Sequence, residues 1–170
     1  MYKIKKVDII TKDKEGLSRM KIMFICTGNI CRSAMAEGIM KKMLQEKGIN
    51  AQVCSCGIYA ETGDGATYNA IEVAKYYNAD ISNHKATNIR FSKIEEMDVI
   101  LCATSSHKQS VLYLYPNLKG KVYTMKEFAR LDNNGLNMDI KDPWGCDMNV
   151  YENCAKEINE CLEKIVELIR

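Results

Sequence analysis

The feature that most constrains the fold is a short apolar run that stops at a polar loop and leads straight into a helical pattern. Residues 21–26 read Lys-Ile-Met-Phe-Ile-Cys, and residues 27–29 read Thr-Gly-Asn. Apolar runs of this length, bounded by turn residues, are typical of buried strands. From residue 33 to residue 47 apolar side chains recur on one helical face until Gly48 ends the pattern. We therefore predict a buried strand, a tight loop and a helix.

The same alternation of strand and helix continues along the chain. We predict strands over residues 51–56, 97–102 and 121–124, helices over residues 67–77, 105–115 and 150–169, and a loop over residues 132–147. Alternation of this kind predicts a parallel sheet covered by helices. The predicted fold class is α/β with three layers, in which a four-stranded parallel sheet has helices on both faces. Ligands of such sheets bind beyond the carboxyl ends of the strands, where the first loop lies.

The chain has 170 residues, which is the length of one domain. The first 20 residues hold six basic and three acidic residues, and the other 150 hold 18 and 19. We expect a flexible basic extension over residues 1–19 and a single domain over residues 20–170. A net charge of +2 gives no reason to expect nucleic acid as a partner. No apolar run approaches the roughly 20 residues that a membrane helix needs, so no membrane partner is expected either.

Eight cysteines and only two histidines are present, and no two cysteines are spaced as Cys-x2-Cys. That pattern does not support a structural zinc site, and we expect neither a metal nor an organic cofactor. The chain is long for a disulfide-stapled domain and carries no signal-peptide pattern. Reduced thiols and a cytoplasmic location are therefore expected.

The loop after the first strand combines a thiol with groups that bind anions. It runs from Cys26 to Ser33 and contains Gly28, Asn29 and Arg32. A loop between a strand and a helix directs backbone N–H groups into one concavity, and the helix N-terminus adds positive potential. Glycine and asparagine accept unusual backbone angles, and the guanidinium fork can hold two phosphate oxygens. Because these groups also stabilise a thiolate, the loop is predicted to bind an oxyanion above a nucleophilic cysteine.

This loop resembles the C-x-G-N-x-C-R-S active-site loop of the low-molecular-weight protein tyrosine phosphatases. The resemblance covers about residues 20–169 and includes, in the same order, the segments 55–57, 82–86, 97–101 and 142–144. It implies the four-stranded parallel fold described above. From residue 67 onward the chain is most similar to a Gram-positive branch that includes the protein arginine phosphatases.

The resemblance also implies the roles of individual residues. Cys26 would attack phosphorus and become a phosphocysteine, Arg32 would clamp the phosphate, and Asp142 would be the general acid and base. The remaining assignments are the phosphate-binding loop residues Thr27, Gly28, Asn29, Ile30, Cys31 and Ser33, the supporting residues Ser55 and His84, and the pocket walls Trp144 and Tyr59.

Two thiols lie five positions apart in this loop. Under peroxide, Cys31 could form a reversible disulfide with Cys26 and protect it from over-oxidation. Cys31 is therefore the hypothetical redox partner of Cys26.

The residue four positions after the nucleophile bears on the substrate. Arginine phosphatases of the similar branch carry threonine there, whereas this chain has Ile30. An apolar side chain favours a flat aromatic ring and offers no partner to a guanidinium group. We therefore expect a phosphotyrosine phosphatase acting on protein and releasing inorganic phosphate, with protein arginine phosphatase as the alternative.

Two further classes fit the sequence less well. Thioredoxin-coupled arsenate reductases share the fold and a similar loop, but they need two further cysteines close by, and only Cys102 follows the third predicted strand. A non-catalytic phosphoprotein-binding module would need neither the nucleophile nor Asp142.

Overall fold

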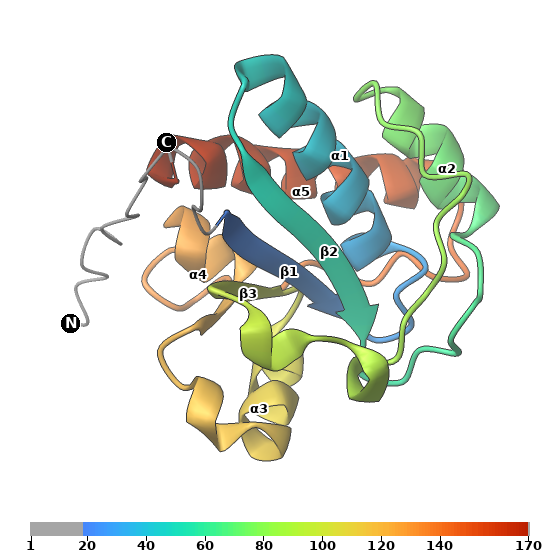
Figure 1. The fold of residues 1–170 in the computed structure, drawn as a ribbon. Helices are drawn as coiled ribbons and strands as arrows, with labels where there is room; N and C mark the ends of the chain where they lie inside the picture. Colours follow the sequence, from blue (N-terminus) through green and yellow to red (C-terminus); the bar gives the residue numbers. More distant parts are fainter. Residues whose placement is uncertain (1–18, 170) are drawn as a thin grey trace.

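The computed structural model describes residues 19–169 (Figure 1). The basic extension expected at the N-terminus lies outside the described residues, apart from Arg19.

The centre of the molecule is one sheet of four strands, and every pairing in it is parallel. The strands are β1 (Met20–Cys26), β2 (Ala51–Gly57), β3 (Val99–Cys102) and β4 (Val122–Thr124), in the order β2-β1-β3-β4. The register places Cys26 beside Gly57. The predicted four-stranded parallel sheet is confirmed. The third strand begins two residues later than predicted, because a 3₁₀ turn, η2 (Ile94–Glu96), leads into it.

Among the described residues, five α-helices surround the sheet. They are α1 (Arg32–Lys47), α2 (Tyr68–Lys75), α3 (Ser105–Leu114), α4 (Met125–Ala129) and α5 (Met148–Leu168), and the short 3₁₀ helices η1 (Ile89–Phe91) and η3 (Pro116–Leu118) complete the set. Helix α4 was not predicted, because its five residues are too few for a periodic pattern. Its sequence signal is a capping box, in which Thr124 and Glu127 satisfy each other's backbone N–H groups.

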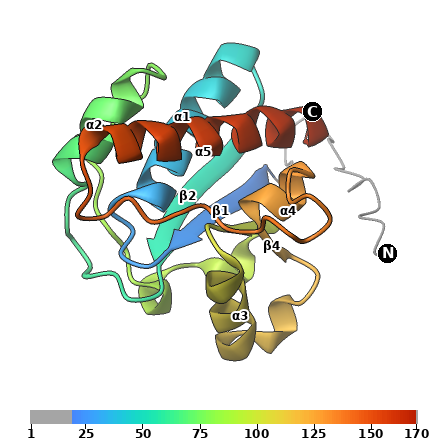
Figure 2. The ribbon, with the colours of Figure 1, turned by 180° about the vertical axis from the view of Figure 1, so that it is seen from behind.

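Two apolar layers, one on each face of the sheet, bury β1 from Ile22 to Cys26. Ile22 and Phe24 belong to the core beneath α1 and α5, whereas Met23 and Ile25 belong to the core beneath α3 and the 3₁₀ turns. Figures 1 and 2 show α1 and α5 on one side of the sheet and α3 on the other. Burial on both faces explains why this strand is an unbroken apolar run.

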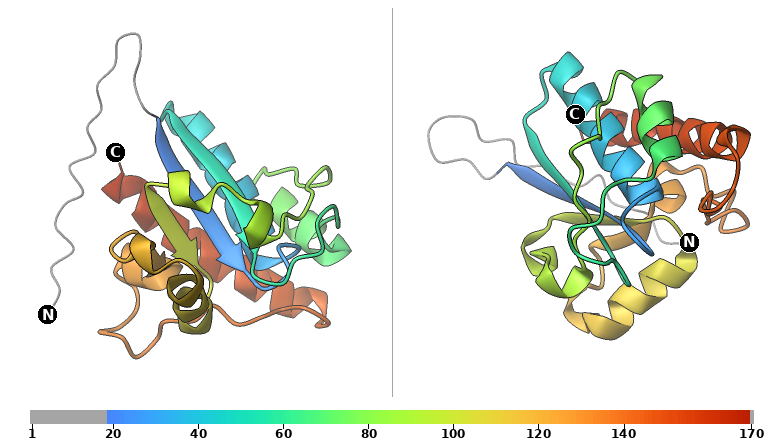
Figure 3. Two further views of the ribbon diagram at one scale, coloured as in Figure 1. Left: turned by 60° about the horizontal axis from the view of Figure 1, so that its bottom comes forward. Right: turned by 90° about the vertical axis from the view of Figure 1, so that its right-hand side faces the viewer.

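The strand order reverses direction at β1. The connection through α1 leads to β2 on one side of β1, and the connection through α3 leads from β3 to β4 on the other side. The loops after β1 and β3 therefore diverge at the carboxyl edge of the sheet (Figure 3), which is where sheets of this type bind ligands. Cys26 is the last residue of β1 and stands at this point.

Within residues 19–169, no helix combines the length and the apolar character that a membrane crossing requires.

Candidate active site

Asn29 holds the loop between β1 and α1 in its shape. Its backbone is in the left-handed region (φ 56°) and its side chain is fully buried. The side-chain amide donates to Ser33 Oγ and to Ser55 Oγ, each at 2.8 Å, and its carbonyl oxygen accepts the backbone N–H of Thr87 at 2.9 Å. All the polar atoms of this side chain are thus used to join the loop to α1, β2 and the segment before η1.

The thiol of Cys26 is almost completely buried at the base of this loop. The backbone N–H of Asn29 points at Sγ from 3.3 Å, and Ser33 Oγ lies 2.9 Å from Sγ. Because Ser33 Oγ accepts a hydrogen from Asn29, its own hydrogen is available to the sulfur. Two donors thus converge on one sulfur atom, an arrangement that stabilises negative charge there.

Arg32 begins α1 beside the thiol, and only 4% of its surface is exposed. Nη1 donates to the Ile140 carbonyl at 3.0 Å, and Nη2 lies 3.3 Å from Asp142 Oδ2. Among the described residues, Nε has no hydrogen-bond partner although it is buried. An arginine held in this way has a donor available for an anion, so the site fits a phosphate group.

The loop that carries Asp142 is fastened to the end of β3 and to the start of α3. The backbone N–H of Ile140 donates to the Ala103 carbonyl at 2.9 Å, and Ser105 N–H donates to Asp139 Oδ1 at 2.7 Å. Asp142 itself is about half exposed. A segment more than 100 residues from Arg32 is thereby held so that its carboxylate meets the guanidinium.

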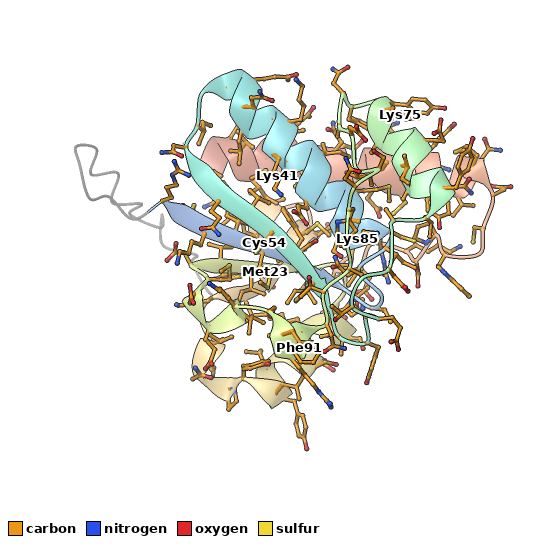
Figure 4. The ribbon with its side chains drawn as sticks, turned by 45° about the vertical axis from the view of Figure 1, so that its right-hand side comes forward. Met23, Lys41, Cys54, Lys75, Lys85 and Phe91 are labelled. Carbon is orange, nitrogen blue, oxygen red and sulfur yellow. The ribbon has the colours of Figure 1, made fainter. Side chains whose placement is uncertain are left out.

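A second set of contacts supports the loop from behind. His84 Nε2 donates to the backbone carbonyl of Asn29 at 2.7 Å. Glu37 Oε2 accepts the hydroxyl of Ser55 and lies 3.9 Å from His84 Nδ1. A crevice of about 380 Å³ opens to this carboxylate, and Lys41 and Lys85 are on the same face (Figure 4). Ser55 and His84 therefore both reach Asn29, where the predicted supporting role needs them.

His107 contacts the loop from the other side. Its Nε2 lies 2.8 Å from Thr27 Oγ1, and its Nδ1 lies 2.8 Å from Thr104 Oγ1. Burial, together with the charge of Arg32, lowers the pKa of His107 to about 4. The imidazole is therefore neutral at pH 7. It bridges the loop after β1 and the first turn of α3.

The second loop thiol, Cys31, faces helix α5. Its Sγ lies 3.2 Å from the hydroxyl of Tyr151 and 3.5 Å from that of Thr67. Burial raises the pKa of Cys31, which keeps it in the thiol form. No disulfide is formed by any of the eight cysteines, all of which are among the described residues.

The two predicted wall residues are exposed, with 76% of Tyr59 and 67% of Trp144 accessible. Their backbones are tied to the site: Tyr59 N–H donates to the Thr27 carbonyl at 2.9 Å, and Trp144 N–H donates to Asp142 Oδ1 at 3.2 Å. Ile30 is half-buried, and its side chain packs against the core beneath α1.

Sequence reasoning missed three residues that contact this site: Glu37, His107 and Tyr151. Glu37 follows Ser33 by one helical turn, which was a usable signal. His107 lies in the first turn of the helix after β3, at the same sheet edge as Cys26. This position was a weaker signal in the sequence. Nothing local marks Tyr151, which is 120 residues from its partner Cys31.

The chain is similar to known proteins along most of its length. The profile of the family described as "Low molecular weight phosphotyrosine protein phosphatase" matches residues 21–170. A protein-arginine-phosphatase of Bacillus subtilis is 32% identical over 151 residues, which are 89% of this chain and 97% of that protein. The low-molecular-weight protein-tyrosine-phosphatase PtpB of Staphylococcus epidermidis is 32% identical over 147 residues, which are 86% and 96% of the two chains.

Solved structures show the same likeness. The low-molecular-weight protein tyrosine phosphatase from T. tengcongensis superposes with a TM-score of 0.80 at 38% identity, covering 87% of this chain and 98% of that one. A mutant of YwlE from Bacillus subtilis superposes with a TM-score of 0.79 at 30% identity, covering 87% and 97%.

Proposed function

The chain belongs to the low-molecular-weight phosphotyrosine protein phosphatase family and is a cysteine-dependent phosphatase, and from this premise we propose that it dephosphorylates protein through a covalent intermediate on Cys26. Residues 20–170 form the catalytic domain in this proposal, and the cytoplasm is its location. The roles below are assigned to this chain's own residues from the contacts they make.

In the first step the Cys26 thiolate attacks phosphorus. An S–P bond forms while the bond from phosphorus to the substrate oxygen breaks, and Asp142 gives its proton to that leaving oxygen. Arg32 and the loop amides of residues 27–31 hold the non-bridging oxygens, where negative charge is concentrated in the transition state. Ser33, which lies 2.9 Å from the sulfur, stabilises the thiolate before attack.

In the second step water attacks the phosphocysteine. The Asp142 carboxylate takes a proton from that water, an O–P bond forms, the S–P bond breaks, and Cys26 leaves again as the thiolate. Inorganic phosphate is the product. Acid–base assistance of this kind contributes about 10²–10⁴-fold to the rate.

One observation supports this mechanism more than the others: the loop that ends at a buried arginine holds a thiol on which two hydrogen-bond donors converge, and Nη2 of that arginine reaches a carboxylate. The test measures kcat/KM on phosphotyrosine peptides for the wild type and for Cys26→Ser. Turnover that disappears in the variant, with phosphate trapped on the wild-type cysteine in rapid acid quench, supports the proposal. Turnover that survives in the variant overturns it.

We assign phosphotyrosine as the substrate residue and phosphoarginine as the alternative. Ile30 and the exposed aromatic rings of Tyr59 and Trp144 favour an aromatic substrate, since apolar surface gives a guanidinium no partner. The alternative is supported by the relatives named as arginine phosphatases, which match this chain as well as those named as tyrosine phosphatases do. Side-by-side kcat/KM on the two phosphorylated residues in one peptide sequence decides between them.

Cys31 remains the proposed redox partner of Cys26. It lies in the same loop, but its thiol contacts Tyr151 and Thr67 and its raised pKa makes it the poorer nucleophile. Peroxide should therefore oxidise Cys26 first, and Cys31 should then attack the sulfenic acid and release water. Peptide mapping after peroxide should find the two cysteines linked, whereas accumulation of sulfinic Cys26 would contradict this.

A further inference from the structure

A surface groove of about 650 Å³ lies next to the phosphate loop, between the segment after β2, the turn η1 and helix α3. The residues that matter for its chemistry are Ile58, Tyr59, Arg90, Gln109, Tyr113 and Leu114. The volume is in the range of ordinary ligand sites in proteins. No step of the mechanism above uses this groove.

Both walls of the groove are attached to the phosphate loop. On one wall, the backbone N–H groups of Ile58 and Tyr59 donate to the carbonyls of Cys26 and Thr27, at 3.0 and 2.9 Å. On the other wall, α3 is joined to Thr27 Oγ1 through His107 at 2.8 Å. The groove therefore begins at the rim of the loop that carries the nucleophile and extends away from it along α3.

Exposed apolar and aromatic side chains line the groove, together with the polar side chains of Asn88, Gln109 and Ser110. Tyr113 is 87% exposed and Leu114 is 47% exposed, and Tyr59 is the exposed ring at the end nearest the loop. Phe91, on the same turn as Arg90, is exposed on this side of the molecule as well (Figure 4). A patch of exposed apolar side chains often marks a binding surface, and tyrosine is enriched where such surfaces bind protein.

The charged side chains of the groove do not favour a charged partner. Glu61 and Arg90 are the two charged residues of its lining, and their charges are opposite. The groove thus has no net charge with which to select an acidic or a basic segment. What it offers is apolar area.

We propose that this groove binds apolar side chains of the protein substrate that adjoin the phosphorylated residue in sequence. The inference rests on the proposed function, because a protein chain that places a phosphorylated side chain over Cys26 crosses the rim of the loop. The groove starts at Ile58 and Tyr59, whose backbone N–H groups bind that rim. The enzyme would then prefer phosphorylated residues with apolar neighbours.

The test separates docking from chemistry by using substrates of two sizes. p-Nitrophenyl phosphate reaches Cys26 but is too small to extend into the groove. Two phosphotyrosine peptides differ only in their flanks, which are leucine and phenylalanine in one and serine and glycine in the other. The variant is Tyr113→Ser combined with Leu114→Ser, both exposed positions on α3, and Tyr76→Ser is the control, since Tyr76 is an exposed tyrosine at the end of α2.

The wild type should hydrolyse the apolar-flanked peptide with about tenfold higher kcat/KM than the polar-flanked one, mainly through KM. The double variant should lose that preference, keep its rate on p-nitrophenyl phosphate and melt at the wild-type temperature. Tyr76→Ser should behave as the wild type on all three substrates. If tyrosine is the wrong residue, the same two flanks on phosphoarginine carry the comparison.

Three outcomes overturn the inference. One is a wild type that does not distinguish the two peptides. Another is a double variant that loses activity equally on the peptides and on p-nitrophenyl phosphate. The third is a wild type that is dimeric in sedimentation and becomes monomeric in the double variant, which would make a second copy the occupant. Absence of hydrolysis on every substrate would instead contradict the proposed function.

Discussion

The side-chain amide of Asn29 donates to Ser33 Oγ at 2.8 Å, and this contact decides which atom the Ser33 hydroxyl serves. Because Asn29 donates to one of the two lone pairs of this oxygen, the hydroxyl hydrogen points elsewhere, and Cys26 Sγ lies 2.9 Å away to accept it. The hydrogen bonding of the Cys26 thiol thus depends on the side chain of Asn29.

Replacing Asn29 by alanine should damage both activity and stability. It strains a left-handed backbone position and removes the three hydrogen bonds that the amide makes with Ser33, Ser55 and Thr87. We expect the free energy of unfolding to fall by about 3 kcal/mol and kcat/KM to fall by about 10²-fold. Urea unfolding and steady-state kinetics measure the two effects. Asn78→Ala is the matched control, because Asn78 has φ 57° but is exposed, so it should show only the backbone strain.

Replacing Asp142 by asparagine should slow the reaction in proportion to how poor the leaving group is. The amide cannot donate the proton that an alkoxide or phenoxide needs, so kcat on phosphotyrosine should fall by about 10²–10⁴-fold. With p-nitrophenyl phosphate, whose leaving group needs little protonation, the loss in the first step should be much smaller. A series of aryl phosphates measures this, and Asp64→Asn, at an exposed carboxylate outside the 132–147 loop, serves as the control. Equal losses across the series would remove Asp142 from the role of general acid.

His107 should act together with Thr27 as one unit. Thr27→Val and His107→Leu each remove the 2.8 Å contact, so each should lower kcat/KM severalfold, and the double variant should be no worse than the singles. His107→Gln, which keeps a side-chain N–H donor, should recover much of the loss. Additive effects in the double-mutant cycle would mean that the two residues act separately.

Acid should weaken the fold through the same histidine. Its pKa is about 4 in the folded protein, mainly because of burial, against about 6.5 unfolded, so between these values the unfolded chain binds the extra proton. The contribution to stability is therefore complete above pH 6.5 and is lost as the pH falls toward 4. The full shift corresponds to about 3 kcal/mol. Urea unfolding at pH 7 and pH 4.5 should show this fall in the wild type and a smaller one in His107→Gln.

Ile30→Thr should move substrate preference toward phosphoarginine. A hydroxyl at this half-buried position gives the guanidinium group a hydrogen-bond partner and removes apolar surface from beside an aromatic ring. The measurement is the ratio of kcat/KM on phosphoarginine to that on phosphotyrosine, which should rise at least tenfold. Ile71→Thr, at a half-buried isoleucine on α2, controls for general loosening of the core. An unchanged ratio would place the choice of substrate elsewhere in the chain.

Structural elements that form within one continuous segment could be predicted from the sequence. The apolar run before Cys26, the helical period after it and the glycine and asparagine between them lie within one continuous segment, so the strand, the loop and the helix were predicted correctly. The role of Cys26 as nucleophile stays a prediction. The short helix α4 was missed because five residues form no periodic pattern, although Thr124 and Glu127 marked its start.

Contacts between distant segments were not predictable in the same way. The imidazole of His107 and the carboxylate of Glu37 join the site because the sheet edge and the first turns of α1 and α3 come together. The spacing of one helical turn from Ser33 hints at Glu37, but no spacing in the chain encodes the meeting with His107. The exposure of Tyr59 and Trp144 depends equally on how their loops sit on the finished sheet, which is why their contacts with substrate remain predictions.

The contact between Cys31 and Tyr151 can form only late in the synthesis of this chain. The loop from Cys26 to Ser33 is synthesised early. The thiol of Cys31 in this loop contacts Tyr151 of the last helix, which is synthesised 120 residues later. Domains generally fold as units as they emerge. A nascent chain that already exposes Cys26 and Arg32 therefore lacks the Tyr151 contact of their loop, and we expect this contact to form only when α5 has left the ribosome and docked.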